Sequence, residues 1–187
     1  MNILEAITER RSIREFQNKP ISRKIIENIL EMTVKAPSGK NRQPWRFVIL
    51  QDNNKNKLVT IMEQNVKYRK LQNLEIGSCE LSINAINQAP IVILVFNPYS
   101  KFENDYNHYR LLTDTQSIGA AIHTMILTSE NYGLGTLWIC DVLSAEREIR
   151  TWLNRKDELV AALAIGYPNQ SPYPRLRNSW QEITEWL

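Results

Sequence analysis

The chain has 187 residues, of which 43% are hydrophobic and 23% charged, the composition of a globular protein rather than of a disordered one. A net charge of +3 is too small to indicate a nucleic-acid-binding protein, and no apolar run approaches the roughly 20 residues of a membrane helix. Cys79 and Cys140 form no CxxC pair, and the N-terminus lacks a secretory signal, so we expect one cytoplasmic domain over 1–187. His108 and His123 join no cluster with metal spacing, so we expect no metal site.

Hydrophobic spacing and turn residues divide the chain into alternating helices and strands. The predicted helices cover residues 2–10, 22–36, 55–88 with a break near Gly77, 114–132 and 144–153. The predicted strands cover residues 45–50, 89–96, 134–140 and 159–166. This order of elements predicts a mixed α and β domain.

Particular residues support these assignments. Asn2 and Glu5 have the spacing of a capping box, which predicts a helix start. The near-continuous apolar run 89–96 is typical of a central strand buried on both faces. Residues 52–54 predict a turn, and residues 97–113 show no clear period, so we expect a loop or lid there.

The C-terminal tail, about 167–187, has an unusual composition. Its prolines exclude helix, so residues 167–178 should be extended and span up to roughly 40 Å. The same tail carries aromatic residues that an exposed coil does not need: Tyr167, Tyr173, Trp180 and Trp186. Packing around a partner subunit is the simplest explanation for an extended aromatic tail.

Arginines gather at both ends of the chain. If the chain is extended after Arg10, then Arg10, Ser12 and Arg14 point to one side, because side chains alternate. The same argument places Arg175 and Arg177 on one side of the tail. Four guanidiniums and a hydroxyl could converge on a phosphate through forked hydrogen bonds. The alternative is that they are unrelated surface charges paired with acidic neighbours, namely Glu9, Glu15 and Glu182.

A polar loop over residues 37–45 links the second predicted helix to the first strand. Ser38, Asn41 and Gln43 offer side-chain donors and acceptors, and Gly39 allows the backbone to approach a ligand closely. Taken alone, the loop is equally a proline-bounded connection with ordinary turn chemistry.

Taken together, these segments resemble the FMN-dependent nitroreductase family. The resemblance covers nearly the whole chain in order. It comprises Arg10-Arg11-Ser12-Ile13-Arg14, the loop and strand 36–47 (APSGKNRQPWRF), Ala89-Pro90 with the strand that follows, 114–127, 133–139 (GLGTLWI) and the late pair Arg175 and Arg177.

The resemblance implies an α+β fold with a central, mainly antiparallel sheet flanked by helices. It also implies an intertwined homodimer with FMN at the subunit interface, where one subunit supplies the arginines and the neighbour supplies the loop. The segment 137–139 would lie along the isoalloxazine. The cofactor-binding residues that it implies are Arg10, Arg11, Ser12, Arg14, Pro37, Ser38, Asn41, Gln43, Leu137, Trp138, Ile139, Arg175 and Arg177.

Two features depart from the family pattern. Members often carry Lys or Arg just before the second strand, near flavin N1 and O2, whereas residues 81–90 contain neither. We therefore expect the charge of reduced flavin to be stabilised elsewhere, with a helix N-terminus near Asp114 as one candidate. Many members also have Glu-Gly or Gly-Gly after the third strand, where this chain has Cys140 and Asp141.

The resemblance implies an oxidoreductase that takes hydride from NADH or NADPH and passes it to a nitroaromatic, quinone or related acceptor by a ping-pong scheme. No side chain stands out as an essential acid or base. One alternative is another reaction of the same fold, such as flavin destruction, dehalogenation or azoline oxidation, with residues 64–80 or 99–113 as a lid. The other is a flavin-binding module without turnover. The expected partners are a second copy of the chain and a small-molecule acceptor, not nucleic acid or a membrane.

Overall fold

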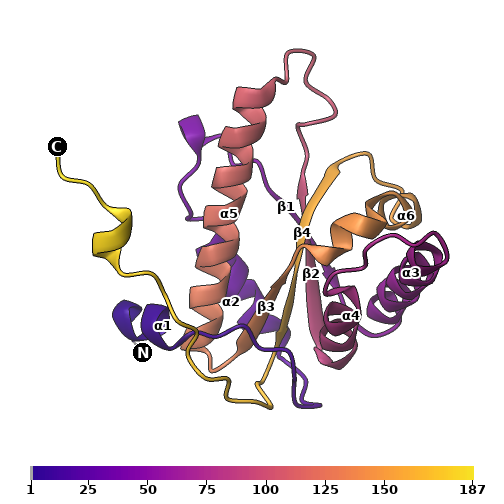
Figure 1. Ribbon diagram of the computed structural model, residues 1–187, viewed down its shortest axis with the longest axis horizontal. Coiled ribbons are helices and arrows are strands. Elements are labelled where there is room, and N and C mark those ends of the chain that lie inside the picture. The colour runs from indigo at the N-terminus through magenta and orange to yellow at the C-terminus, as the bar shows by residue number, and fades with distance from the viewer. Residues whose placement is uncertain (1) are drawn as a thin grey trace.

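A computed structural model describes residues 2–187 as an antiparallel sheet with helices on both faces (Figure 1). The helices are α1 (Ile3–Glu9), α2 (Arg23–Thr33), α3 (Asp52–Leu71), α4 (Cys79–Gln88), α5 (His108–Asn131) and α6 (Glu146–Trp152). The strands are β1 (Arg46–Leu50), β2 (Ile91–Asn97), β3 (Gly135–Ile139) and β4 (Glu158–Gly166). Short 3-10 turns occupy η1 (Gly39–Asn41), η2 (Asp141–Ala145) and η3 (Trp180–Ile183).

The strand order is β1-β2-β4-β3, and each neighbouring pair is antiparallel. Every residue of β2 is buried, because β2 lies between β1 and β4 and has helices on both faces. The expectation of a central strand buried on both faces is thereby confirmed, as is the α+β fold with a mainly antiparallel sheet. β1 and β3 are the edge strands.

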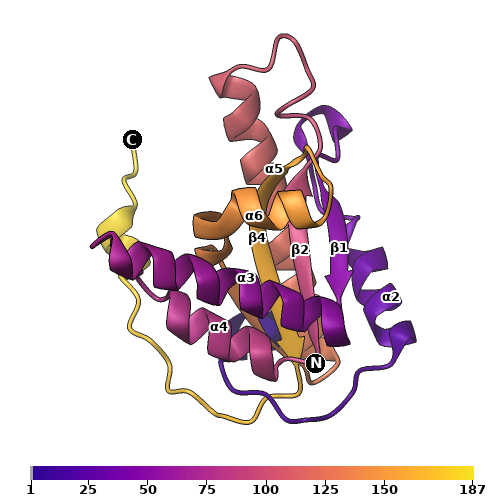
Figure 2. The same cartoon turned by 90° about the vertical axis from the view of Figure 1, so that its right-hand side faces the viewer.

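Alternate residues of the sheet face two separate cores, as the two-residue period of a strand requires. Val92, Leu94 and Phe96 pack with α3, α4 and α6, which cover one face (Figure 2). Ile91 and Ile93 pack on the opposite face with α2 and α5. Each fully buried side chain of this size contributes about 1.5–3 kcal/mol to folding, so the two cores fix the helices firmly against the sheet.

Several helix ends follow the sequence signals. The Asn2–Glu5 capping box forms, and the Ser22 side chain accepts a hydrogen bond from the backbone of Ile25. At the C-terminal end of α5, Gly133 has a φ of 67°, and the N–H of Leu134 donates to the carbonyl of Ser129. This is the paired hydrogen-bond pattern that a glycine stop produces.

Two predicted boundaries are wrong. Residues 52–54 are not a turn but the first residues of α3, and Asp52 adopts a φ of 47° at the junction. Helix α5 begins at His108 rather than at Asp114, with the Asn107 side chain accepting the N–H of Arg110. Residues 108–113 carry no buried side chain, since α5 extends beyond the sheet there, so this part has no core-facing hydrophobic period (Figure 1).

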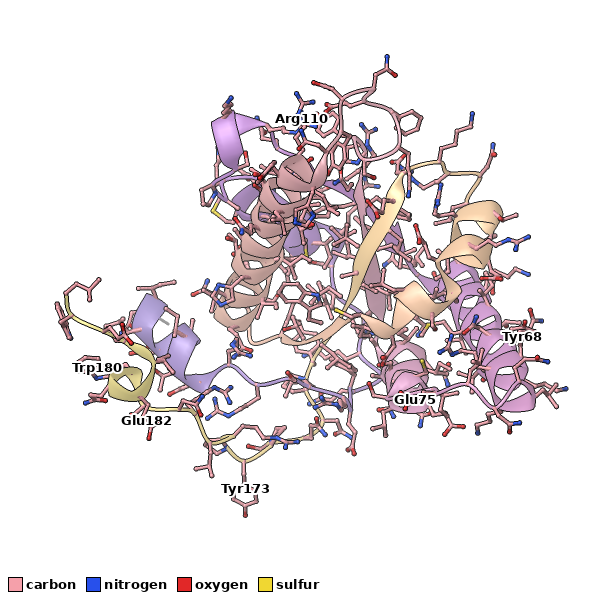
Figure 3. All side chains as sticks on the ribbon, turned by 45° about the horizontal axis from the view of Figure 1, so that its top comes forward. Tyr68, Glu75, Arg110, Tyr173, Trp180 and Glu182 are labelled. Atoms are coloured by element: carbon pink, nitrogen blue, oxygen red, sulfur yellow. The ribbon has the colours of Figure 1, made fainter. Side chains whose placement is uncertain are left out.

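The tail leaves β4, passes below α5 and rises outside α1 (Figure 1). Residues 170–179 form neither helix nor strand, and η3 begins at Trp180 with a capping box between Ser179 and Glu182. Its apolar side chains are exposed: Tyr173 points away from the body of the molecule (Figure 3) and is 92% exposed, and Trp186 is 86% exposed. Within the described residues, no helix has the length and apolar character needed to cross a membrane.

Replacing Gly166 by Ala should destabilise the protein by about 1–3 kcal/mol, the usual cost of overpacking. A Cβ at Gly166 would lie 2.7 Å from both Phe16 Cδ1 and Pro90 Cδ, and the proline ring cannot rotate away. Urea unfolding would measure the loss.

The matched control is Gly119→Ala in α5, where the nearest atom to a Cβ is Trp138 Cη2 at 3.7 Å. This helical substitution should be neutral or should stabilise by up to about 1 kcal/mol. Equal unfolding midpoints for the two variants would contradict the packing argument.

Candidate functional site

The segment 10–14 runs extended from the end of α1 along the free edge of β3. Ile13 is buried, and its N–H donates to the carbonyl of Thr136 at 2.9 Å. Ser12 and Arg14 are exposed on either side of it in sequence, as the predicted alternation requires. Arg11 has a different position, because its guanidinium donates to the carbonyls of Thr8 and Arg10 at the end of α1.

None of the five candidate arginines forms an ion pair with a carboxylate of the described residues; they are Arg10, Arg11, Arg14, Arg175 and Arg177. Across residues 2–187, the ion pairs involve other side chains, and Glu182 is instead used in the cap of η3. Arg14 Nη1 contacts only the carbonyl of Ser12, at 3.4 Å, and Arg177 Nη1 contacts the carbonyls of Arg175 and Leu176. The expected pairing with Glu9, Glu15 or Glu182 does not form, which leaves the guanidiniums able to bind an anion.

The tail begins beside this segment. Asn169 donates its N–H to the carbonyl of Glu15, and the N–H of Arg14 donates to Gln170 Oε1 at 2.8 Å. Arg175 and Arg177 follow in the exposed part of the tail. The two arginine groups thus belong to segments that are hydrogen-bonded to each other, although they are more than 160 positions apart in the sequence.

The three expected residues of β3 divide between two faces. Leu137 and Ile139 are buried in the core that α3 and α4 cover, so their side chains cannot contact a ligand. Only the Trp138 side chain is available on the other face, where it is 41% exposed and lies against Gly119 of α5. The expectation that segment 137–139 offers a surface to a flavin is thereby narrowed to Trp138 and the backbone.

The backbone of β3 has a free edge, since only β4 pairs with it as a strand. The carbonyl of Thr136 points to that edge, because it accepts the N–H of Ile13. In a strand, the backbone N–H and carbonyl of residues two positions apart point to the same side. The N–H and carbonyl of Trp138 therefore point to the free edge, as the carbonyl of Thr136 does. They supply one donor and one acceptor beyond the last residue that segment 10–14 covers.

The loop over residues 37–43 lies at the opposite end of α5. The N–H of Gly39 donates to Ser117 Oγ at 3.2 Å, and a Cβ at Gly39 would collide with Thr113. The Ser38 hydroxyl accepts the N–H of Gln43 at 3.0 Å, which closes the loop on itself. The remaining candidates, Pro37, Asn41 and Gln43, are exposed.

One chain does not bring the loop and the arginines together. Glu130, near the C-terminal end of α5, lies close to Arg10 and Arg11: burial raises the pKa of its carboxyl, against the opposing effect of these two charges. Ser117 and Glu130 are 13 residues apart on the same helix, which corresponds to roughly 20 Å at a rise of 1.5 Å per residue. The loop and the arginine segment therefore lie at well-separated points along α5 within one chain.

An ion-pair network that the sequence did not reveal fixes the loop. Arg42 Nε lies 2.9 Å from Asp114 Oδ1, and Arg42 Nη2 lies 2.6 Å from Glu103 Oε2. Asp114 is 1% exposed and lies in the second turn of α5, not at a helix N-terminus, so the proposed stabilisation of reduced flavin by an N-terminus at Asp114 is wrong. The one available signal in the sequence was a charged residue on the helix face that also carries Ile118, Ala121 and Ile122.

Cys140 and Asp141, which follow β3 in place of the family's usual pair, have defined surroundings in the structure. Asp141 Oδ2 accepts hydrogen bonds from the hydroxyls of Ser78 and Ser82 at the start of α4. Burial, and then the neighbouring Asp141, raise the pKa of the Cys140 thiol. A thiol with a raised pKa stays protonated at neutral pH, so Cys140 is a poor nucleophile.

The fold defines a class of protein: an α+β domain with a four-stranded antiparallel sheet, flanked by helices, and an arginine-bearing segment along one sheet edge. Residues 7–167 match the model of the nitroreductase family, so the chain belongs to that family.

Similar proteins carry several different names. The chain is 30% identical over 182 residues to a 5,6-dimethylbenzimidazole synthase of Rhodospirillum rubrum, covering 92% of this chain and 85% of the relative. It is 27% identical over 177 residues to iodotyrosine deiodinase 1 of Sus scrofa, which covers 89% of this chain but only 61% of the relative. A solved FMN- and NADPH-dependent nitroreductase from Sphigopyxis sp. strain HMH has a TM-score of 0.81 at 17% identity, covering 100% and 99% of the two chains, which shows the shared fold.

Replacing Glu103 by Gln should reduce stability at neutral pH but not at acidic pH. The ion pair with Arg42 lowers the pKa of Glu103 below its ordinary value of 4.5. The unfolded chain therefore binds this proton more readily, so the ion pair stabilises the fold above about pH 4.5 and the contribution is lost as pH falls. Urea unfolding from pH 7 to pH 3 should show the difference between wild type and variant narrowing.

Asp105→Asn is the control, because Asp105 pairs with the same Arg110 but is 74% exposed and therefore screened by solvent. Its effect should be small throughout. A Glu103→Gln difference that stays constant with pH would contradict the assignment.

Proposed function

We propose that the protein is an FMN-dependent oxidoreductase that takes hydride from NADH or NADPH and reduces a nitroaromatic, quinone or related small molecule. The observation that carries the proposal is the group of arginines without carboxylate partners beside the free edge of β3. Membership of the nitroreductase family and the shared fold with an FMN- and NADPH-dependent nitroreductase support it.

The residues present fit FMN in charge and in hydrogen-bonding capacity. Arg10, Arg14 and Arg177 would bind the phosphate, with the Ser12 hydroxyl beside them and Arg175 further along the tail. The N–H and carbonyl of Trp138 would bind the polar edge of the ring system, and its indole would cover one side. Arg11 would act mainly by fixing the end of α1, where its guanidinium already donates to two carbonyls.

We propose a homodimer as the working unit. The loop residues Pro37, Ser38, Asn41 and Gln43 would complete the site of the neighbouring subunit, because the loop is anchored at Ser117 of α5, roughly 20 Å along the helix from Glu130, which lies close to Arg10 and Arg11. The exposed aromatic tail would pack on the neighbour. Cys79 and Cys140 form no disulfide, in keeping with a cytoplasmic protein.

FMN, when bound, supplies the hydride acceptor and donor chemistry. The chain's own residues bind and orient it, exclude water from one side and set the local charge. With no Lys or Arg in residues 81–90, the backbone N–H of Trp138 and the arginines are the groups left to stabilise added negative charge. The Asp141 carboxylate, fixed by Ser78 and Ser82, would oppose it.

The relatives favour a second candidate within the same family. The match to an iodotyrosine deiodinase favours dehalogenation of a halogenated aromatic, and the match to 5,6-dimethylbenzimidazole synthase favours the alternative of flavin destruction. The chain spans about three fifths of the length of the deiodinase, so the activity of that whole protein is a proposal here. Halide release, and loss of flavin under air with excess reductant, would identify either reaction.

The purified protein should be yellow, and anaerobic addition of NADH or NADPH should bleach it. Stopped-flow absorbance at the flavin band measures this step, and a nitroaromatic or quinone should then restore the colour. Colourless protein that cannot be reconstituted with FMN would overturn the proposal. Bound FMN that neither donor reduces would leave a binding module or another reductant.

Arg10→Ala with Arg14→Ala should weaken FMN binding by at least about 100-fold, because each lost charged hydrogen bond costs about 1.5 kcal/mol or more. Fluorescence titration with FMN measures the change. Arg23→Ala with Arg147→Ala removes the same charge from two exposed sites and should bind FMN normally.

Mixed dimers test whether the site is shared. Asn41→Ala with Gln43→Ala should also lose FMN as a homodimer. Co-expressed with the Arg10, Arg14 variant, it should form mixed dimers that bind one FMN, since one site would combine both wild-type halves. Mixed dimers without FMN would mean that each chain builds its own site.

A further inference from the structure

Arg42 lies between two of the proposed flavin-contacting residues but its side chain points away from them, into the protein. Its Nε is 2.9 Å and 3.2 Å from the two carboxylate oxygens of Asp114. Its Nη2 is 2.6 Å from Glu103 Oε2, and its guanidinium lies over the Tyr99 ring at 4.3 Å. These contacts come from two segments of the chain: Asp114 belongs to α5, whereas Tyr99 and Glu103 lie between β2 and α5.

The backbone around Arg42 is strained. Lys40, Asn41 and Gln43 have φ values of 53°, 54° and 51°, in the left-handed region that residues other than glycine seldom occupy. Such conformations persist only where the surroundings determine them. The loop is held by hydrogen bonds at Gly39 and Ser38, and Arg42 is the residue within it that forms ion pairs.

The partner of Arg42 is itself fixed to the framework. Asp114 is buried in α5, and the Tyr106 hydroxyl donates to its carboxylate at 3.0 Å. Asn97, at the end of β2, donates to the same hydroxyl at 2.8 Å. The position of Arg42 is therefore set by the central strand and by the longest helix of the described residues.

Glu103 extends the network into the segment 98–107, which links β2 to α5. Arg110 Nη1 lies 2.7 Å from the same Glu103 oxygen that Arg42 contacts, and Arg110 also binds both oxygens of Asp105. Arg110 lies at the exposed end of α5 (Figure 3). Arg42 thus joins the loop 37–43 to the segment 98–107 through one shared carboxylate.

We infer that Arg42 is a positioning residue: its ion pair with Asp114 holds Asn41 and Gln43 in the conformation that binds the partner subunit's flavin, and its ion pair with Glu103 couples that binding to the order of segment 98–107. The inference rests on the proposed function, because it requires FMN at the site that the loop helps to form. It assigns no chemical step to Arg42 itself.

The first arm of the test measures FMN affinity. Arg42→Met combined with Asp114→Asn removes the ion pair without leaving a buried unpaired charge, and should weaken FMN binding about tenfold. Arg42→Lys keeps the charge but loses the fork, so it should give an intermediate loss. Arg46→Met, an exposed arginine four positions later, is the matched control and should bind FMN as wild type does.

The second arm measures coupling. Lys101 is exposed and is the one trypsin site between Asn97 and Arg110. FMN should slow cleavage after Lys101 in the wild-type dimer. In Glu103→Gln, FMN should bind with nearly wild-type affinity but should protect Lys101 less, whereas Asp105→Asn should retain the protection. A residue that only stabilised the fold would not separate affinity from protection in this way.

The outcomes distinguish the two proposals. If wild-type protein binds no FMN, the proposed function fails. If wild type binds FMN and the Arg42→Met, Asp114→Asn variant binds it equally well, the positioning role is overturned. If that variant does not fold, unchanged affinity in Arg42→Lys together with unchanged protection in Glu103→Gln overturns it.

Discussion

The length and rigidity of α5 are the constraint on which the candidate site depends. Its N-terminal half carries the loop 37–43, fixed through Thr113 and Ser117, and its C-terminal end lies against the arginine segment through Glu130. A helix packed along its apolar face against the sheet does not bend to bring its ends together. The anchors of the two segments on α5 stay roughly 20 Å apart in one chain, and this separation is the basis of the proposed homodimer.

The proposed dimer would also account for two exposed features of the surface, the apolar tail and the arginines without ion pairs. Apolar side chains of the tail, including Tyr173 and Trp186, are exposed, and arginines beside the free edge of β3 have no carboxylate partner. Exposed apolar surface costs free energy that packing against a second chain would recover, and exposed guanidiniums without ion pairs can still bind an anionic ligand. The network around Arg42 differs, since its charges are satisfied within the chain and serve to fix a strained loop.

Charge distribution around the proposed flavin is where the chain departs most from its family pattern. The helix N-terminus expected at Asp114 is absent, because α5 begins six residues earlier and Asp114 is neutralised by Arg42. Asp141, bound by two serine hydroxyls, adds negative charge near the end of β3. Few cations near the ring would disfavour the negative charge of reduced flavin and so favour the oxidised form. The choice of hydride donor and of acceptor would then decide whether the reaction proceeds.

The sequence by itself determined the elements whose signal is local. The capping box at Asn2, the stop at Gly133 and the buried run of β2 were all predicted, because caps, turns and apolar periods depend on neighbouring residues. The alternation that exposes Ser12 and Arg14 was also local. The start of α5 was not predicted, because residues 108–113 face solvent and show no hydrophobic periodicity that would mark a helix.

Only the tertiary structure decided which of these residues could act together. It placed Leu137 and Ile139 in the core and left Trp138 exposed, because the face of a strand residue depends on what packs there. It paired Arg42 with Asp114, 72 positions away, and it separated the loop from the arginines by the length of a helix. Contacts of that range depend on how the elements pack, and no local pattern of residues encodes them.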